Sequence, residues 1–294
     1  MTETLSVTVT GGCGRLGSRT VRALADCGHD VVAVDRVAPD VERENVVFRA
    51  VDLTSEDSAR RVVREAESDI VVHLGAIPSP ESGPNVYENN SISTYYVLDE
   101  AGKAGADVVQ ASSESAYGFP FAASPRLPEY LPIDETHPMQ PEDPYGTSKV
   151  VAEELGRAAS RRYDVSVTSL RFSNIMYPGN YTVLEGRDDL PNGVGNFWCY
   201  VDGRDCVSAI SRAIEAEIDG HEAYNVAAAE NYLGRPTVEA FEEFFGEVPE
   251  LRDLDGEDSA LSIEKAEAQL GWEPEHTWRE AAEEPFEEPP FAAD

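Results

Sequence analysis

The stretch Tyr145-Gly-Thr-Ser-Lys149 holds two side chains that together could carry out acid–base chemistry. Residues four apart on a helix lie one turn apart on the same face, and the following run 150–155 is typical of a helix. An ammonium close to a phenol favours the phenolate and lowers the pKa of the Tyr. We therefore expect Tyr145 to accept a proton from an alcohol. Because the same spacing also arises by chance on exposed helices, the rest of the chain must support this interpretation.

The composition is strongly acidic but still rich enough in apolar residues to build a core. The 294 residues include 56 Asp and Glu against 23 Lys and Arg, which gives a formal net charge of −33, and 41% are hydrophobic. This length and this hydrophobic content suit a large globular domain. Nucleic-acid binding as a main function is excluded, because no basic patch can replace counterions. We interpret the acidity as adaptation to a salty cytoplasm, and hence to a halophilic source.

The charge predicts that the folded state depends on salt. With few cations to balance the carboxylates, self-repulsion must be screened by dissolved ions. We expect folded structure to be lost when salt is removed, and thermal melting in molar and millimolar KCl measures this. An unchanged melting temperature would contradict a salt-adapted surface.

Cysteine usage and hydropathy indicate the compartment. The four cysteines have neither paired zinc spacing nor a secreted disulfide pattern, so we predict no metal site. The chain has no amino-terminal signal and no apolar run of membrane length. We therefore expect a cytoplasmic protein with no membrane partner.

The amino-terminal region has the order of a dinucleotide-binding unit. A predicted strand at 5–10 leads into Gly11, Gly14 and Gly17, and a helical pattern follows as far as Gly28. Glycines at these positions let the backbone turn tightly and approach a pyrophosphate at a helix amino terminus. The order of strand, glycines and helix is more specific than the glycines alone.

The next strand, 30–34, ends in an acid that indicates the cofactor. Asp35 lies about 20 residues past the glycines, where a carboxylate can hydrogen-bond a ribose diol. Such a carboxylate should repel a 2′-phosphate, which favours NAD over NADP. However, Arg15 and Arg36 could both reach that phosphate, so NADP stays an alternative.

Strands and helices continue to alternate along the chain. Further strands are predicted at 46–51, 69–74, 106–111, 165–172 and 223–228, and helices at about 55–67, 86–102, from 145, after 203, and near 237–245 and 262–270. This alternation predicts an α/β fold, a Rossmann doubly wound parallel sheet with a small carboxy-terminal substrate-binding portion. We divide the chain into 1–173, 174–282 and an acidic, Pro-rich tail at 283–294, which we expect to be poorly ordered.

Several motifs that occur in order along the chain resemble those of one family. They are Gly11-x-x-Gly14-x-x-Gly17, Asp35, Asp52-Leu53, His73-Leu74-Gly75-Ala76, Asn90, Ser113, Tyr145-x-x-x-Lys149 and Leu270-Gly-Trp-Glu-Pro274. Together they resemble the extended short-chain dehydrogenase/reductases, which include nucleotide-sugar epimerases, dehydratases and sugar dehydrogenases. The resemblance extends from about residue 5 to residue 280.

This resemblance implies roles for individual residues. Tyr145 would be the general base or acid, Lys149 would activate it and hold the nicotinamide ribose, and Ser113 would hydrogen-bond the substrate oxygen. Substrate contacts would come from Ser113, Glu114 and Asn174. Cofactor contacts would come from Gly11, Gly14, Arg15, Leu16, Gly17, Asp35, Arg36, Asp52, Leu53, Leu74, Gly75, Ala76, Asn90, Tyr145 and Lys149. The family also pairs as homodimers through the two helices that here carry Asn90 and Lys149.

Three positions leave alternatives open. Asn90 is followed by Ser91 and Ser93 where the family usually has Val and Gly, so a plain helix-face amide is an equal alternative. His73 is better interpreted as a satisfied core residue than as a ligand. The aromatic run 197–200 could form a sugar-stacking wall, although packing of the small domain is the preferred interpretation.

Two departures from the family pattern indicate which reaction is catalysed. The related dehydratases carry Asp-Glu after the catalytic hydroxyl residue, whereas this chain has Glu114-Ser115, which argues against dehydration. The substrate segment 175–199 is short, and Arg187 and Arg204 are the candidate cations for a nucleotide diphosphate. An epimerase needs a firm hold on the nucleotide while its keto intermediate rotates.

We therefore expect an NAD(P)-dependent sugar dehydrogenase that acts on a free aldose or a close derivative and first forms a lactone. A uronate or sugar phosphate would need a cation for its acid group, for which Arg171 or Arg187 could serve. The alternative is a UDP-sugar 4-epimerase that holds NAD tightly.

Overall fold

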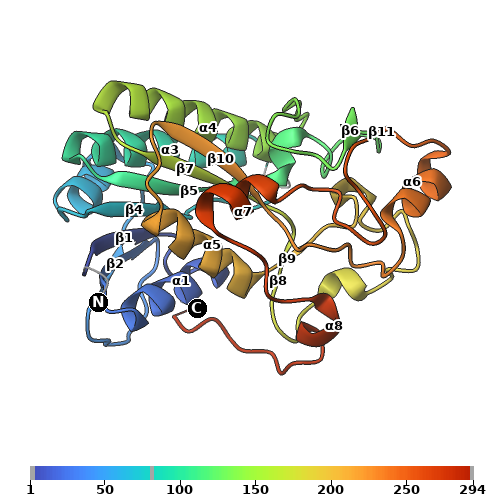
Figure 1. Cartoon of the computed structure of the whole chain (residues 1–294). Coiled ribbons are helices and arrows are strands. Elements are labelled where there is room, and N and C mark those ends of the chain that lie inside the picture. Colours follow the sequence, from blue (N-terminus) through green and yellow to red (C-terminus); the bar gives the residue numbers. More distant parts are fainter. Residues whose placement is uncertain (1–3, 80–82, 292–294) are drawn as a thin grey trace.

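A seven-stranded parallel sheet forms the centre of the protein, in the order β10-β7-β5-β4-β1-β2-β3 (Figure 1). The computed structural model describes residues 4–79 and 83–291. The strands are β1 (Ser6–Thr10), β2 (Asp30–Asp35), β3 (Val46–Ala50), β4 (Ile70–His73), β5 (Asp107–Ser113), β7 (Val167–Phe172) and β10 (His221–Val226). This sheet confirms the predicted Rossmann fold class. The strand order reverses between β1 and β4, and such a point places a ligand crevice at the carboxyl ends of these strands.

Helices cover both faces of the sheet. The helices are α1 (Arg15–Asp26), α2 (Glu56–Ala59), α3 (Pro84–Ala104), α4 (Pro144–Tyr163), α5 (Gly203–Glu215), α6 (Thr237–Phe245), α7 (Glu264–Leu270) and α8 (Trp278–Ala281). In Figure 1, α3 and α4 pack side by side on one face, and α1 lies beside α5 on the other. Within the described ranges, no helix combines the length and the apolar composition that a membrane span requires.

The sheet separates two hydrophobic cores. In β4, the adjacent residues Val71 and Val72 are both fully buried but belong to different cores, because successive strand side chains point to opposite faces. Val97 of α3 lies in one core, and Ile210 of α5 lies in the other. Strands buried on both faces explain the continuous apolar runs in the sequence.

Several short elements were not predicted. Two-residue strands pair as β6 (Tyr130–Leu131) with β11 (Glu250–Leu251) and as β8 (Ile175–Met176) with β9 (Val201–Asp202). Single turns occur at η1 (Arg60–Arg64), η3 (Glu114–Tyr117), η4 (Thr182–Leu184) and η5 (Val194–Asn196). The helix expected at 55–67 is α2 followed by the π-helical turn η1, and so is shorter. Elements of two to five residues are too short to produce a hydrophobic period.

The second segment of the chain contributes to the main sheet, because β10 pairs with β7 from His221 to Val226. The boundaries 1–173, 174–282 and 283–294 themselves stay predictions.

The acidic tail differs from the expectation of poor order. Over residues 283–291 it returns along the surface to α1 (Figure 1), where the Glu287 carboxylate lies 2.6 Å from Arg22. The ring of Phe291 is buried, with its centroid 5.3 Å from that of Phe48. The composition of the tail predicted poor order. It could not show that Arg22 and Phe48, which are distant in the sequence, contact the tail in the folded protein. The last three residues of the predicted tail lie outside the described ranges.

Candidate active site

The fold brings Tyr145 to Ser113 through the first turn of α4. The Asp143 side chain caps this helix by accepting a hydrogen bond from the Gly146 backbone N–H at 2.8 Å. A Cβ atom at Gly146 would lie 2.4 Å from the carbonyl oxygen of Ser115, so glycine lets α4 approach η3, the turn that follows β5, closely. Ser113 ends β5, where its hydroxyl donates a hydrogen bond to Ser115 at 3.2 Å and lies close enough to the phenol of Tyr145 to influence its pKa.

Lys149 lies one turn further along α4 and is almost completely buried. Its Nζ donates a hydrogen bond to the Ala111 carbonyl at 2.8 Å and lies 5.5 Å from the centroid of the Tyr145 ring. Burial lowers the pKa of Lys149 to about 8.

His73 is hydrogen-bonded through both ring nitrogens, at 2.7 Å to Thr10 and 3.0 Å to Thr94, as expected of a satisfied core residue.

The expected lowering of the Tyr145 pKa by Lys149 is wrong for the chain by itself. Burial raises the pKa of Tyr145 to about 12, and the neighbouring Ser113 hydroxyl opposes this only in part. Lys149 does not counteract the burial, because its ammonium lies over the phenol ring and donates to a backbone carbonyl. Geometry therefore supports an acid–base pair, while the pKa match that catalysis needs must come from the assembled site.

Glu114 follows Ser113 and is held by the substrate segment. Its Oε2 accepts a hydrogen bond from Ser173 at 3.0 Å, and its Oε1 accepts one from Asn196. Burial raises the pKa of Glu114 to about 8, and these hydrogen bonds oppose the shift. The backbone N–H of Asn174 lies near this carboxylate and also opposes the rise in the pKa of Glu114, so two of the predicted substrate residues are neighbours in the fold.

The Asn90 side chain hydrogen-bonds the backbone of the loop after β4. Its side-chain oxygen accepts from the Ile77 N–H at 2.8 Å, and its amide donates to the Ile77 carbonyl at 3.1 Å and to Ser148 at 3.2 Å. These bonds favour the structural interpretation of Asn90, which holds α3, α4 and the loop after β4 together.

A cavity of about 240 Å³ lies at the carboxyl ends of β1, β2 and β4. Nine of its lining residues are predicted cofactor contacts: Gly11, Gly14, Asp35, Arg36, Asp52, Leu53, Leu74, Gly75 and Ala76. The other lining residues are Val34, Val51, Thr54, Ile77, Asn89 and Ser93, which the sequence reasoning did not identify. Arg15 and Leu16 begin α1, and Arg15 stacks over Tyr177 at 4.6 Å from the ring centroid.

The residues around this cavity fit a dinucleotide. Gly11 has φ +67°, and a Cβ at Gly17 would lie 1.9 Å from the Gly11 carbonyl oxygen, so both positions require glycine. Helix α1 begins after Gly14 without a side-chain cap, which leaves its amino terminus open to an anion. Asp35 is oriented by the N–H groups of Cys13 and Arg36, at 3.1 and 2.7 Å.

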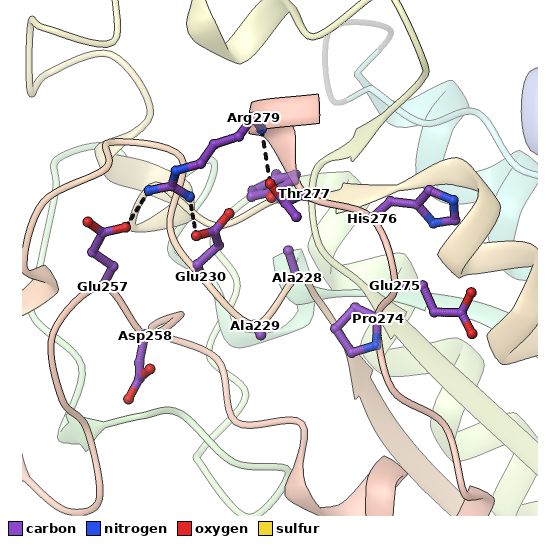
Figure 2. A pocket seen from close by; sticks show the side chains of 11 residues that line it. Ala228, Ala229, Glu230, Glu257, Asp258, Pro274, Glu275, His276, Thr277 and Arg279 are labelled. Carbon is purple, nitrogen blue, oxygen red and sulfur yellow. Dashed lines mark hydrogen bonds and ion pairs between the residues drawn. The ribbon is translucent and has the colours of Figure 1, made fainter. Parts of the chain in front are cut away.

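A second cavity, of about 500 Å³, lies in the carboxy-terminal part of the chain (Figure 2). Arg279 extends across it and pairs with both Glu230 and Glu257. None of the predicted site residues lines this cavity. Because its arginine is already engaged by two carboxylates, the cavity offers little positive charge to a phosphorylated ligand.

Comparison with known proteins identifies the family. A model of the NAD dependent epimerase/dehydratase family matches residues 7–227. The chain belongs to this family. Membership confirms the predicted family resemblance and the predicted nicotinamide cofactor.

Relatives within the NAD dependent epimerase/dehydratase family carry out different reactions. UDP-glucose 4-epimerase of Corynebacterium glutamicum is 27% identical and aligns over 93% of this chain and 92% of its own length. L-arabinose 1-dehydrogenase (NAD(P)(+)) of Haloferax volcanii is 31% identical over 76% of this chain and 88% of its own. The structure of Thermus thermophilus UDP-glucose 4-epimerase in complex with NAD matches with TM-score 0.68 and 27% identity, covering 95% of this chain and 96% of that one. Membership alone therefore does not separate dehydrogenase from epimerase.

Two interpretations of residues near the family's substrate region can now be decided. Arg171 is unavailable to a substrate acid group, because it is buried and makes two 2.8 Å hydrogen bonds to Glu153. The aromatic run 197–200 is packing, because its side chains are buried and Trp198 stands edge-on to Phe241.

The structure also adds residues to the site that sequence reasoning missed. Asn196 and Ser173 hold Glu114, and Phe121 contacts the ring of Tyr145, with the two centroids 6.1 Å apart. Of the contacts that position the site, only the Asp143 cap could have been found from the sequence, because Asp followed by Pro is typical of a helix start. The other contacts join distant parts of the chain and have no local signal.

Asp35 provides a test of cofactor choice. Replacing it with Ala should raise kcat/KM for NADP relative to NAD by about tenfold or more, because a carboxylate that repels a 2′-phosphate is removed beside Arg36. Steady-state kinetics with both cofactors measure this ratio. Asp40→Ala, which removes an exposed carboxylate outside the cavity, is the matched control. Equal ratios in the two variants would contradict the role of Asp35.

Proposed function

We propose that this protein is an NAD(P)-dependent sugar dehydrogenase that oxidises a free aldose or a close derivative. The proposal combines the Ser113, Tyr145 and Lys149 arrangement with a dinucleotide cavity and a substrate region that has little free positive charge. NAD is the proposed preferred cofactor, because Asp35 lines the cavity.

The observation that carries the choice of substrate is the pairing of Arg204. Its guanidinium lies 3.0 Å from Asp202 and 3.0 Å from Glu284, so two carboxylates already neutralise this candidate phosphate ligand. A diphosphate would have to displace one of these carboxylates or accept like-charge repulsion. A neutral sugar avoids this penalty.

Arg187 is the other candidate cation. Its guanidinium stacks over Trp278, 4.6 Å from the ring centroid. One arginine suits the single acid group of a uronate or a sugar phosphate better than a nucleotide diphosphate. Close sugar derivatives of this kind therefore stay within the proposal.

The chain's own residues supply the proton chemistry. In the proposed reaction Ser113 hydrogen-bonds the reacting sugar oxygen, and Tyr145 accepts the proton of that hydroxyl, the anomeric one. Loss of this proton and of a hydride from the same carbon converts an aldose to a lactone. A bound nicotinamide supplies the hydride acceptor. Lys149 would hold the nicotinamide ribose, and its pKa of about 8 lets its charge respond near neutral pH.

The second candidate function is UDP-glucose 4-epimerisation. It is supported by relatives such as the Corynebacterium glutamicum UDP-glucose 4-epimerase, which aligns over 93% of this chain. The same Tyr145 and Ser113 would serve it, because oxidation and re-reduction of a sugar use one acid–base pair. The two candidates differ in whether reduced cofactor is released.

A sugar panel at high salt separates these candidates. Purified protein with NAD or NADP and a range of aldoses, uronates and sugar phosphates should release NADH or NADPH in step with substrate consumed. Interconversion of UDP-glucose and UDP-galactose without net NADH would overturn the dehydrogenase proposal in favour of the epimerase.

We further propose a homodimer formed through α3 and α4. Ile92 and Tyr95 of α3 are large apolar side chains that are exposed in the single chain, and a partner would cover them.

A cytoplasmic location and a halophilic source likewise stay proposals. The halophilic source rests on the acidic composition, and the cytoplasmic location rests on the cysteine usage and the hydropathy of the sequence.

A further inference from the structure

Phe121 combines exposure with contact to the proposed catalytic phenol. Its side chain is 39% exposed, although Phe is a residue that folding usually buries. Its ring stands nearly perpendicular to that of Tyr145, at 83° and with centroids 6.1 Å apart. A phenyl ring therefore borders the place where a reacting hydroxyl must come, and part of its surface is left uncovered.

The backbone on both sides of Phe121 is fastened to the rest of the site. The Ala123 N–H donates to the Glu142 carboxylate at 3.2 Å, and Arg126 donates to the carbonyls of Gly118 and Gln140 at 3.0 and 2.6 Å. These bonds tie the loop to the segment just before α4. The position of the Phe121 ring beside Tyr145 is therefore built into the loop.

The preceding residues fasten the loop to the substrate segment. Phe119 is buried against Phe197, with ring centroids 4.9 Å apart. A Cβ atom at Gly195 would lie 2.8 Å from the carbonyl oxygen of Pro120, so the loop and η5 are in close contact. Alternate aromatic residues of the loop thus point to different places: Phe119 points into the core, and Phe121 points to Tyr145.

An uncovered aromatic ring at this place suits one class of ligand. A pyranose carries hydroxyls around its edge and C–H groups on its faces, so it can hydrogen-bond at the edge while a face packs on an aromatic ring.

We propose that Phe121 is a specificity-determining residue, whose ring packs against the C–H face of the sugar while a hydroxyl of that sugar reaches Tyr145. This inference rests on the proposed sugar dehydrogenase function. It predicts a preference for sugars with several C–H groups on one face. An epimer that places a hydroxyl on that face would lose the contact.

The experiment compares Phe121→Ala with Phe286→Ala. Phe286 is the matched control, because it is a phenylalanine of almost equal exposure, 41%, in the carboxy-terminal tail. With the best aldose of the panel and saturating NAD, Phe121→Ala should raise KM for the sugar by about tenfold, with KM for NAD nearly unchanged. Phe121→Trp, which keeps an aromatic face, should stay within about threefold of the wild type.

Three outcomes would overturn the inference. Equal sugar KM values in Phe121→Ala and Phe286→Ala would do so while leaving the dehydrogenase proposal intact. A Phe121→Trp variant as weak as Phe121→Ala would show that size or loop folding matters rather than the aromatic face. If the wild type releases no NADH or NADPH with any sugar of the panel, the proposed function fails, and this inference fails with it.

Discussion

Replacing Tyr145 with Phe should lower kcat by about a thousandfold, since general acid–base catalysis typically contributes about 10²–10⁴. The substitution removes one oxygen atom and keeps the ring that contacts Phe121 and lies beneath Lys149. NAD affinity and melting temperature should therefore change little. Stopped assays of product formation and titration with NAD measure the two effects separately.

A matched control comes from the same helix. Tyr163 ends α4, and its phenol hydrogen-bonds Asp99, far along the helix from Ser113. Tyr163→Phe should therefore retain most of the wild-type kcat. If Tyr145→Phe keeps a similar rate, the phenol is not the proton acceptor, and the proposed chemistry is wrong.

Replacing Glu153 with Ala should destabilise the protein by about 3–5 kcal/mol, because it leaves a buried guanidinium without its partner. Glu153 is completely buried, and Arg171 is 2% exposed; two hydrogen bonds of 2.8 Å join them. Glu153 also accepts a hydrogen bond from Ser112, at 2.7 Å, next to the site. Equilibrium unfolding in urea at constant high salt measures the loss.

Glu154 provides the comparison for this prediction. It is the next residue of α4, carries the same charge and pairs with Arg157 at 2.6 Å, but its side chain is 63% exposed. Exposed ion pairs contribute about 0–1 kcal/mol, so Glu154→Ala should have a small effect. Equal destabilisation in the two variants would mean that burial of the Glu153–Arg171 pair does not govern its contribution.

Much of the cofactor region could be predicted because its residues follow one another along the chain. Gly11 and Gly14 lie in the turn before α1, and Asp35 ends the next strand, so local order alone predicted that they line one cavity. The tandem of strands and helices likewise predicted the parallel sheet. By contrast, composition gave the wrong expectation for the tail, whose order depends on contacts such as Glu287 with Arg22.

Sequence by itself determined the fold class, the family and nine of the residues around the cavity at the carboxyl ends of β1, β2 and β4. The reason is that residues close together along the chain lie on neighbouring elements of the sheet. Tertiary structure alone decided the pKa of Tyr145, the partners of Arg171 and Arg204, and the position of Phe121. Each of these depends on burial or on a partner distant in the sequence: Arg204 meets Glu284, 80 residues away. The charge, the solvent exposure and the contacts of a side chain depend on the folded structure, and the order of residues along the chain does not predict them.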